Sequence, residues 1–593
     1  MRRCAAIVLL LLFPMALRAG DAPEAFLPRT TQVYLRWDGI APHRPAYAKT
    51  AFGQTLAGDT GVFLAGLSKA VQEGMSTILS VEQLLGGVPP EELQKLQTSA
   101  NEAAKFLPEV SEHGFLIAWE LTAIEQPQGR LFVVFPDAGA KPGPYFGVIR
   151  LAASLAKMPV QETKIAGRAV NHAKVDLLHL AWWVEGGHVV IYFGTDTPES
   201  IIKDMADAKK AKLSTNSLFR RVADFKKFET AARLYLDLPA LVKIASKDKK
   251  VAKVIDNLGV TNVGALVMYS GFDGDAERGL TEWDLPGPRK GLLRLLEGQP
   301  FRLADVPPLP PDVVSWSLTN FDAALAYDIG LKALAEILAV LSPDEAEQLK
   351  SFEKQMKDVL GIDLRNDLLA AMGDKVGFYS AWSEAPLTLS QTLMIKVKDG
   401  KKLQAALDQA VKSVLKLIGP DASLRKRTFH GVEVREVRVR KQGFIFVPSY
   451  TIHNGWLVVS LYPQAVHGYI ARVEGRLERW QPSERVRSLF AQMPQEVIAV
   501  GYDDPRPALR LLMSFAPVIG GTVRSFAAEI PFEVDSIPNA QEVTRLLFPN
   551  VSTTVDDGKT LRIEGRSSLA LPFSAGIVDT FGLFFVIGAA QVF

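Results

Sequence analysis

The sequence predicts an α+β protein in which an antiparallel or mixed sheet carries long amphipathic helices, in a unit that occurs twice as a tandem duplication. Strand-like runs arrive in adjacent groups joined by short turns instead of alternating strictly with helices. Several long stretches repeat apolar residues at spacings of three and four, which is typical of helices with one buried face. The chain of 593 residues is too long for one compact core, so at least two domains are expected.

The N-terminus has the layout of a secretory signal peptide over residues 1–19. Arg2 and Arg3 precede an apolar run from Ala5 to Leu17, and small residues follow it. The alternative is a retained membrane anchor, but the apolar run is shorter than the roughly 20 residues that span a bilayer. We therefore expect an exported protein of the periplasm or cell envelope.

The cysteine count and the net charge argue against several classes of protein. Cys4 is the one cysteine and lies within the predicted signal peptide, so the mature chain is expected to have no disulfide, thiol nucleophile or cysteine metal site. A lipoprotein anchor would need a cysteine after the apolar run. The formal net charge of +2 implies no long-range field that would gather nucleic acid.

Short sequence segments that occur twice divide the mature chain into two domains and a linker. We predict a first repeat domain over 20–297, a proline-rich linker over 298–312 and a second repeat domain over 313–572. Five short segments of the first domain recur in the second, in the same order and at near-constant spacing. They include AGRAVNHAKV with HGVEVREVRV, NSLFRRVADF with RSLFAQMPQE, and ARLYLDLPALVKI with IAVGYDDPRPALRLL, which places Asp237 on Asp503.

Each domain begins with a strand and continues with long helices, at 68–85 in the first and 323–341 in the second. Strand pairs follow, at 114–121 with 130–136 and at 375–382 with 387–397. A helix at 401–418 and a meander over 444–462 come next, and each domain closes on a hairpin with an Asp-Gly turn.

The stretch HLAWWVEGGHVV at first suggests an active site, because it combines histidines, tryptophans and a glutamate. Its part WVEGGHVV aligns without gaps on TIHNGWLV, so that Gly186-Gly187 falls on Asn454-Gly455. Asn-Gly is a preferred two-residue hairpin turn. We therefore predict a repeated β-turn-β unit followed by a helix, not an active site.

The last residues, 573–593, are nearly all apolar. Asp579 interrupts them, and the run that remains is too short to span a bilayer. A terminal element packed on a domain is expected, and a tail that contacts the membrane is the alternative.

Two strand starts carry a family resemblance. Leu27-Pro28-Arg29-Thr30-Thr31 leads into an apolar strand, and a Leu-Pro-Pro-Asp start follows at 309–312. With the signal peptide, this plan resembles a family of exported bacterial proteins described only as a domain of unknown function. The resemblance implies an extracytoplasmic bacterial protein and no particular chemistry.

The sequence contains residue types that bind metal ions, but their spacing does not match a metal-binding motif. None of the eight histidines forms a His-Glu-x-x-His pair, and His172 and His179, seven apart, are expected on opposite strand faces. The turn from Phe272 to Glu277 could suggest calcium, but Asp-Gly between two strands favours a hairpin.

No nucleophile elbow, phosphate loop or dinucleotide fingerprint occurs, and Gly520-Gly521 is expected to end a helix. We therefore assign no catalytic, cofactor-binding or metal-binding residue. A basic strip of Arg435, Arg438, Arg440 and Lys441 could hold an anionic polymer or lipid headgroups, with Arg438 and Arg440 on one strand face. A half-exposed antiparallel strand is the alternative.

The sequence favours a non-enzymatic binding or structural protein whose partner is an unknown envelope protein, polymer or lipid, with no nucleic acid and no cofactor. A membrane contact could come through 573–593. The first alternative is a carrier of an apolar ligand or lipid held between helices and sheet. The second is an enzyme with a site of scattered polar residues.

Overall fold

The computed structural model describes residues 22–63, 94, 98–99, 101–103, 105–123, 128–207, 209–384, 391–441, 444–526 and 537–569. The predicted signal peptide (1–19), the predicted helix at 68–85 and the apolar C-terminal segment (573–593) lie outside these ranges. Below, the first half means residues 22–297 and the second half residues 298–569.

Within the described ranges, the strands form one sheet of 21 strands, in which every pairing is antiparallel. The strands of the first half are β1 (Val33–Trp37), β2 (Phe115–Ala123), β3 (Gln128–Phe135), β4 (Gln161–Ile165), β5 (Arg168–Val175), β6 (Leu178–Glu185), β7 (His188–Gly194), β8 (Glu229–Leu236), β9 (Leu266–Asp273) and β10 (Ala276–Asp284). Those of the second half are β11 (Val313–Asn320), β12 (Met372–Ala381), β13 (Gln391–Val397), β14 (Ala422–Phe429), β15 (Val432–Lys441), β16 (Phe444–Phe446), β17 (Ser449–His453), β18 (Trp456–Ser460), β19 (Ala499–Asp503), β20 (Asn550–Asp556) and β21 (Thr560–Ser567). The predicted α+β class is confirmed, and the sheet is antiparallel rather than mixed.

The two halves have the same strand order. From its outer edge inward, the first half reads β4-β5-β6-β7-β3-β2-β1-β8-β9-β10, and the second reads β14-β15-β17-β18-β13-β12-β11-β19-β20-β21. The extra strand β16 pairs with β15. This is the arrangement that a tandem duplication would produce.

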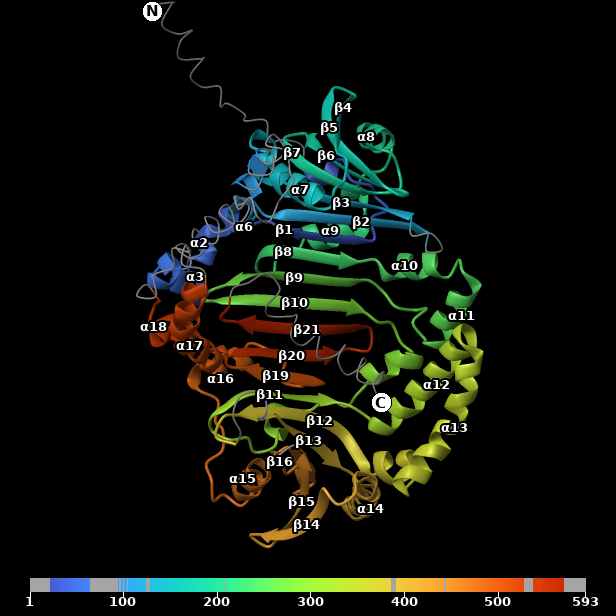
Figure 1. The fold of residues 1–593 in the computed structure, drawn as a ribbon, viewed down its shortest axis with the longest axis vertical. Coiled ribbons are helices and arrows are strands. Elements are labelled where there is room, and N and C mark those ends of the chain that lie inside the picture. The colour runs from blue at the N-terminus through green and yellow to red at the C-terminus, as the bar shows by residue number, and fades with distance from the viewer. Residues whose placement is uncertain are drawn as a thin grey trace, which may run out of the picture.

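The halves meet where β10 pairs with β21, from Glu277 opposite Ser567 to Asp284 opposite Thr560. Figure 1 shows the strands following one another across the molecule from β4 at the top to β14 at the bottom. The predicted linker is packed between elements of the second half: Phe301 forms a bridge with Val497, and Phe301 and Leu309 are buried in its core.

Helices lie beside both ends of the strands (Figure 1). Those of the first half are α2 (Arg44–Tyr47), α3 (Ala51–Leu56), α6 (Phe106–His113), α7 (Gly143–Leu155), α8 (Pro198–Ala206), α9 (Ser217–Ala223), α10 (Leu238–Ala245) and α11 (Lys249–Asn257). Those of the second half are α12 (Ala323–Leu341), α13 (Pro343–Leu360), α14 (Gly400–Ile418), α15 (Pro463–Val473), α16 (Glu484–Ala491), α17 (Pro505–Phe526) and α18 (Ala540–Thr544). Short 3-10 turns include η1 (Pro23–Ala25), η2 (Ala41–His43) and η5 (Gly291–Leu296). Within the described ranges, no helix is both long and apolar enough to cross a membrane.

The predicted helices at 323–341 and 401–418 are confirmed as α12 and α14. Asp322 and Asp399 cap them, each accepting a backbone N–H three residues on, which satisfies a donor that the first turn leaves open. The expected stop at Gly520-Gly521 is wrong, because α17 continues to Phe526. Glycine inside a helix costs only about 1 kcal/mol relative to alanine and does not by itself end one.

An aromatic group recurs in the two cores. Tyr34 in β1 stacks on Tyr235 in β8 at 5.5 Å, and Trp316 in β11 stacks on Tyr502 in β19 at 6.1 Å. A phenylalanine from the helix before the second strand of each pair approaches it, Phe219 from α9 in the first half and Phe490 from α16 in the second. Because aromatic side chains bury large areas, these groups anchor helix to sheet in both halves.

The strand register also corrects one predicted alignment. The amide of Asp237 donates to the Gln32 carbonyl, and the amide of Asp504 donates in the same way to the Val314 carbonyl. Asp504, not Asp503, is therefore the structural counterpart of Asp237.

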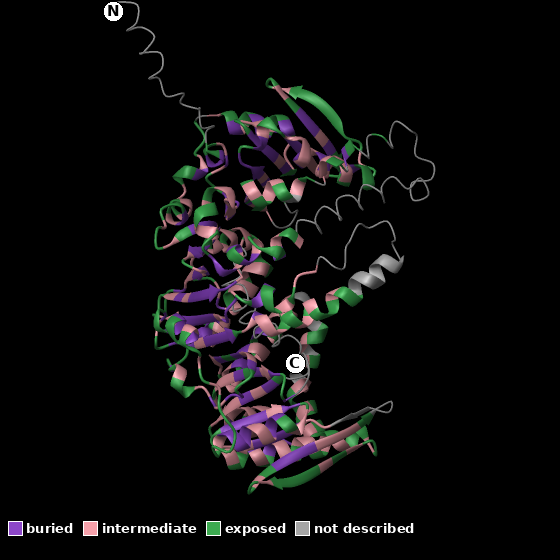
Figure 2. Cartoon of the chain, turned by 90° about the vertical axis from the view of Figure 1, so that its left-hand side faces the viewer, coloured by how far each residue is buried: buried purple, intermediate pink, exposed green. Residues whose placement is uncertain are grey.

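The predicted hairpin turns are confirmed. Glu185 pairs with His188 around Gly186-Gly187, and His453 pairs with Trp456 around Asn454-Gly455. All four turn residues have positive φ, as a type I′ turn requires. The outermost strands β4 and β14 are mostly exposed (Figure 2) and rich in charged residues, which discourages pairing with other chains.

Candidate functional site

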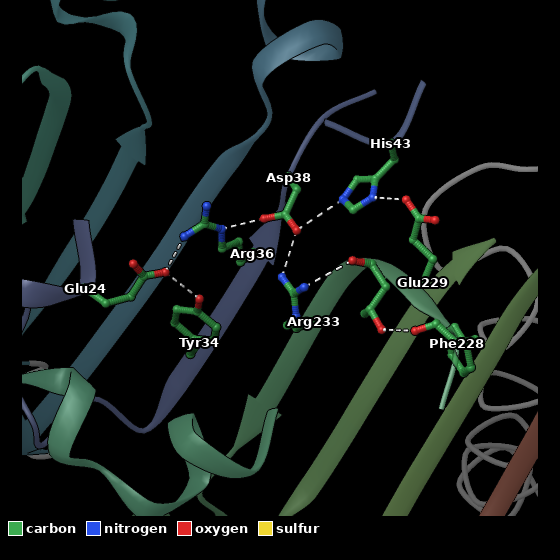
Figure 3. Close-up of polar contacts among 9 residues, drawn as sticks. Glu24, Tyr34, Arg36, Asp38, His43, Phe228, Glu229 and Arg233 are labelled. Carbon is green, nitrogen blue, oxygen red and sulfur yellow. Dashed lines mark hydrogen bonds and ion pairs between the residues drawn. The ribbon is translucent and has the colours of Figure 1, made fainter. Parts of the chain in front are cut away.

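A chain of ion pairs crosses one end of β1 and β8 in the first half (Figure 3). Glu24, in η1, accepts a hydrogen bond from the Tyr34 hydroxyl at 2.8 Å and forms an ion pair with Arg36 at 2.6 Å. Arg36 also donates to Asp38 through Nε, at 2.6 Å. Glu24 is 4% exposed, so the segment before β1 is held to the sheet by buried charge.

Asp38 is the centre of this network. Besides Arg36, Arg233 donates to it at 2.8 Å, and His43 Nε2 lies 3.4 Å away. Burial alone would raise the pKa of Asp38, but the hydrogen bond with His43 and the two guanidinium groups hold it well below its usual range. Asp38 is therefore a fixed negative charge.

His43 bridges two carboxylates. Its Nε2 faces Asp38 and its Nδ1 lies 2.9 Å from Glu229 (Figure 3). The hydrogen bond to Asp38 raises the pKa of His43, burial opposes this, and Glu229 raises it further. With an acceptor at each ring nitrogen, the protonated ring is favoured, and this histidine is a linker of charges and not a free general base.

A cavity of about 330 Å³ lies on the same half, between α8, the strands β2 and β3, and the segment that precedes β1. Its apolar wall consists of Phe26, Pro28, Phe132, Ile201, Met205 and Ala211. Its polar wall consists of Arg29, Thr30, Glu120, Arg130, Asp204, Lys210 and Lys212. The volume is at the small end of the range for small-molecule sites.

Three of the four cationic side chains that line the cavity have partners within the chain. Arg130 Nε donates to Asp196 at 2.7 Å, and Lys210 forms an ion pair with Asp204 at 2.6 Å. Lys212 donates to the carbonyl of Met205 at 2.9 Å, close to the end of α8. These three cations are engaged by the chain itself, and Arg29 is the fourth cation of the cavity lining.

Glu120 is different. Its side chain is 10% exposed, and Oε1 accepts a hydrogen bond from the Thr30 hydroxyl. Its other oxygen, Oε2, is buried and accepts no hydrogen bond from the described residues, and the nearest cation, Arg130 Nη1, is 3.7 Å away. Because Oε2 is shielded from solvent, its charge is offset by the nearby Arg130 guanidinium and not by a molecule in the cavity.

In the second half, the helix that corresponds to α8 is α15, and a buried side chain of α15 forms an ion pair with the sheet side of this half. The offset that aligns Gly187 with Gly455 also aligns Asp204 of α8 with Arg472 of α15. Arg472 Nη1 donates to Glu384 at 2.5 Å and Nη2 donates to the Tyr379 hydroxyl at 3.1 Å. Burial raises the pKa of Tyr379, which stays a donor to Glu384 at 2.7 Å.

The predicted basic strip is divided by the structure. Arg438 and Arg440 share one face of β15, as expected, whereas Arg435 lies on the other face. Arg435 is buried and forms ion pairs with Asp408 at 2.5 Å and Glu433 at 2.6 Å. Arg440 is exposed, and the side chain of Lys441 lies outside the described residues.

The expectation for His172 and His179 is wrong. They lie in two strands, β5 and β6, and a turn separates them, so the period-two rule for one strand does not apply. His172 is opposite Ala181 and His179 is opposite Lys174, which places both histidines on the same face. Burial and the nearby Lys174 lower the pKa of His179.

Within the described part of the chain, no three His, Asp or Glu side chains are grouped to hold a metal ion. The turn between Asp273 and Ala276 joins β9 to β10 as the predicted hairpin. Asp273 is engaged by two guanidinium groups, those of Arg278 at 3.1 Å and Arg566 at 2.9 Å.

Sequence reasoning missed both the cavity and the ion-pair chain. Thr30 and Glu120 are ninety positions apart, and Asp38 and Arg233 are further apart still. No local spacing signals such pairs, because only the order of strands brings them together.

No protein-family profile and no curated protein matches the chain. Among solved structures, it is similar to two crystal forms of a protein named TP0453. Form III is 10% identical with a TM-score of 0.23, over 47% of this chain and 85% of that one. Form I is 10% identical with a TM-score of 0.22, over 46% and 82%. Likenesses at this level carry no conclusion about fold or function.

Proposed function

We propose that this chain is an exported binding protein of the bacterial periplasm or cell envelope, and that it holds a small ligand in the first-half cavity. The observation that carries the proposal is the cavity itself, about 330 Å³ in volume, in which an apolar wall faces a polar and charged one. Small-molecule sites in proteins combine these two kinds of lining.

A binding role is favoured over catalysis by the state of the neighbouring charges. His43 has a carboxylate at each ring nitrogen, and three of the four cavity cations are engaged by carboxylates or carbonyls. Groups held in this way position a ligand more readily than they exchange protons with it.

A carrier of an apolar ligand is the second candidate, since Phe26, Phe132, Ile201 and Met205 form a continuous apolar wall between helix and sheet. At about 30 Å³ per water, the cavity has room for about ten water molecules. It therefore suits a short alkyl chain, and not a whole phospholipid.

The shared strand order and the recurring aromatic groups support an origin by tandem duplication. In such a history, one half would have kept or gained a ligand cavity while Arg472 filled the corresponding place in the other.

The binding proposal is tested with the mature chain and a variant that fills the cavity, Ala211→Trp. A library of small amphipathic compounds is screened by the shift in melting temperature. Compounds should stabilise the wild type and the control Ala169→Trp, whose residue is exposed on β5, but not Ala211→Trp. The proposal fails if no compound stabilises the wild type, or if stabilisation survives in Ala211→Trp.

Export is tested separately. Alkaline phosphatase fused after residue 40 should become active in a bacterial host, because that enzyme needs an oxidising compartment. Deleting residues 2–19 should abolish the activity, and retained activity would contradict export.

A further inference from the structure

The outer end of the second half, where α14 lies beside β14 and β15, is strongly cationic. Its residues 400–441, called the α14 tip below, contain eleven lysine and arginine residues and four aspartate and glutamate residues. Their formal net charge is +7, in a chain whose total is +2. We infer that the α14 tip docks on the surface of an anionic lipid bilayer. The tip is separate from the first-half cavity, so this inference goes beyond the proposed function.

The apolar stripe of α14 continues past the core that it packs on. Leu403 is fully buried, and Val411, two turns further on, packs against the same core. The stripe then reaches Val414 and Ile418, which are 39% and 45% exposed, and the neighbouring Leu417 is 70% exposed. Large aliphatic side chains that are grouped and exposed at one end of a helix indicate a contact surface.

Many cations of the tip have no anionic partner in the chain. Its paired cations are Lys426 and the arginines at 427, 435 and 438, which Asp408, Glu433 and Glu436 engage. Among the described residues, no ion pair engages Lys412, Lys416, Arg425 or Arg440, and all four are exposed. These charges are therefore available to an anionic surface.

A groove of about 540 Å³ lies between α14 and β14 within the tip. Lys412 and Lys416 line it beside the apolar side chains of Leu415 and Leu424. Its carboxylate, Asp408, is already engaged by lysine and arginine side chains of β14 and β15. Cations beside an apolar floor suit a phosphate headgroup and the first carbons of its acyl chain.

The combination of charge and apolar surface favours a bilayer over a soluble polyanion. A nucleic acid or an acidic polysaccharide would use the cations of the tip but would leave Val414, Leu417 and Ile418 in water. At a bilayer surface, cations meet the anionic headgroups while aliphatic side chains enter the acyl boundary. Both features of the tip then contribute to binding.

The outer end of the first half repeats the exposed apolar feature. α7 follows β3 and precedes β4, as α14 follows β13 and precedes β14. Leu155, at the end of α7, is 63% exposed, and Leu177, in the turn between β5 and β6, is 71% exposed. Figure 2 shows the two outer ends of the sheet, at the top and the bottom, projecting to the same side of the molecule. A flat surface can therefore approach both ends at once.

The test is flotation of the mature chain with lipid vesicles at pH 7. One set contains only phosphatidylcholine, and in the other about a third of the lipid is phosphatidylglycerol. The chain should bind the anionic vesicles more tightly, and raising the salt from about 0.1 M to about 0.5 M should weaken this binding.

Two variants separate the contributions of charge and apolar surface. Each cation near an anionic bilayer strengthens binding roughly fivefold, so Lys412→Gln/Lys416→Gln/Arg440→Gln should weaken it on the order of a hundredfold. Leu417→Asn/Ile418→Asn removes the apolar contact and should weaken binding roughly tenfold or more. All five side chains are exposed, so both variants should melt close to the wild type.

Matched control variants change the same residue types elsewhere. Lys249→Gln/Lys250→Gln/Lys253→Gln removes three exposed lysines of α11, and Leu334→Asn/Leu477→Asn changes two exposed leucines outside the tip. Both controls should bind the anionic vesicles as the wild type does. Any contribution of residues 573–593 is the same in every variant.

Equal binding to both kinds of vesicle, or unchanged binding in the triple variant of the tip, would overturn the inference. If the triple variant loses binding while Leu417→Asn/Ile418→Asn keeps it, the tip is a general polyanion site and not a bilayer contact. These outcomes leave the cavity proposal standing, because the compound screen with Ala211→Trp tests it independently.

Discussion

Arg472 and Glu384 form a buried ion pair of 2.5 Å at the place where the first half has its cavity. Both side chains are almost fully buried, at 2% and 6% exposure, and Tyr379 completes the group. At the aligned position of α8, the first half has Asp204 in place of this arginine.

Arg472→Met should destabilise the protein by about 3–5 kcal/mol, because it leaves the Glu384 charge buried without its cation. Urea unfolding at pH 7 measures the change. The double variant Arg472→Met/Glu384→Leu should recover much of the loss, since no charge then remains. Arg302→Met, in an exposed pair with Glu496, is the control and should not shift the midpoint. An equal effect in the control would contradict the prediction.

His43 should make stability depend on pH. Its pKa is raised in the folded state, chiefly by the hydrogen bond to Asp38, so its contribution is full below the unfolded value of about 6.5 and is lost as pH rises through the folded value. The difference in unfolding free energy between the wild type and His43→Gln should therefore shrink from pH 6 to pH 9. Asp38→Asn should flatten this dependence. A difference that grows with pH would show that the sign is wrong.

Removing the Tyr34 hydroxyl should cost about 1 kcal/mol, because Glu24 loses one hydrogen bond and keeps Arg36. Tyr34→Ala should cost about 3–5 kcal/mol, since the ring is 1% exposed and packs on Tyr235. Denaturant unfolding of Tyr34→Phe and Tyr34→Ala measures both. Tyr327→Phe, whose hydroxyl is 3.5 Å from Glu353 at the surface, should have little effect. Equal losses in Tyr34→Phe and Tyr34→Ala would show that the ring adds nothing to the packing.

The two aligned hairpin turns should respond alike to alanine. Gly187 and Gly455 have φ of 90° and 76°, where an L-residue is strained, so Gly187→Ala and Gly455→Ala should each cost about 1–2 kcal/mol. Gly330→Ala is the matched control, because Gly330 is inside α12 with nothing near a new Cβ, and it should stabilise the protein by about 0.5–1 kcal/mol. Melting temperatures rank the three, and a stabilising Gly187→Ala would contradict the turn assignment.

Much of the local structure could be predicted from the sequence. The apolar spacing of α12 and α14 and the turn chemistry of Asn454-Gly455 act over a few residues, so these elements follow from pattern alone. Two local predictions were wrong. Gly520-Gly521 does not end α17, and a turn between His172 and His179 reverses the expected strand faces.

The candidate site could not be predicted from the sequence. Thr30 reaches Glu120, and Asp38 meets Arg233, only because strands from distant parts of the chain lie side by side. Burial is likewise a tertiary property. Arg435 looked like part of a basic strip, yet the fold buries it against Asp408 while Arg440 on the other face stays exposed.

The sequence by itself determined the α+β class, the confirmed helices and the hairpin turns, because periodicity and turn preference are short-range effects. Only the tertiary structure decided that one antiparallel sheet runs through both halves across β10 and β21. It also decided which charges are paired and that Oε2 of Glu120 is not hydrogen-bonded to any described residue. The physical reason is that desolvation and ion pairing depend on which surfaces the fold brings together, and no spacing along the chain encodes that.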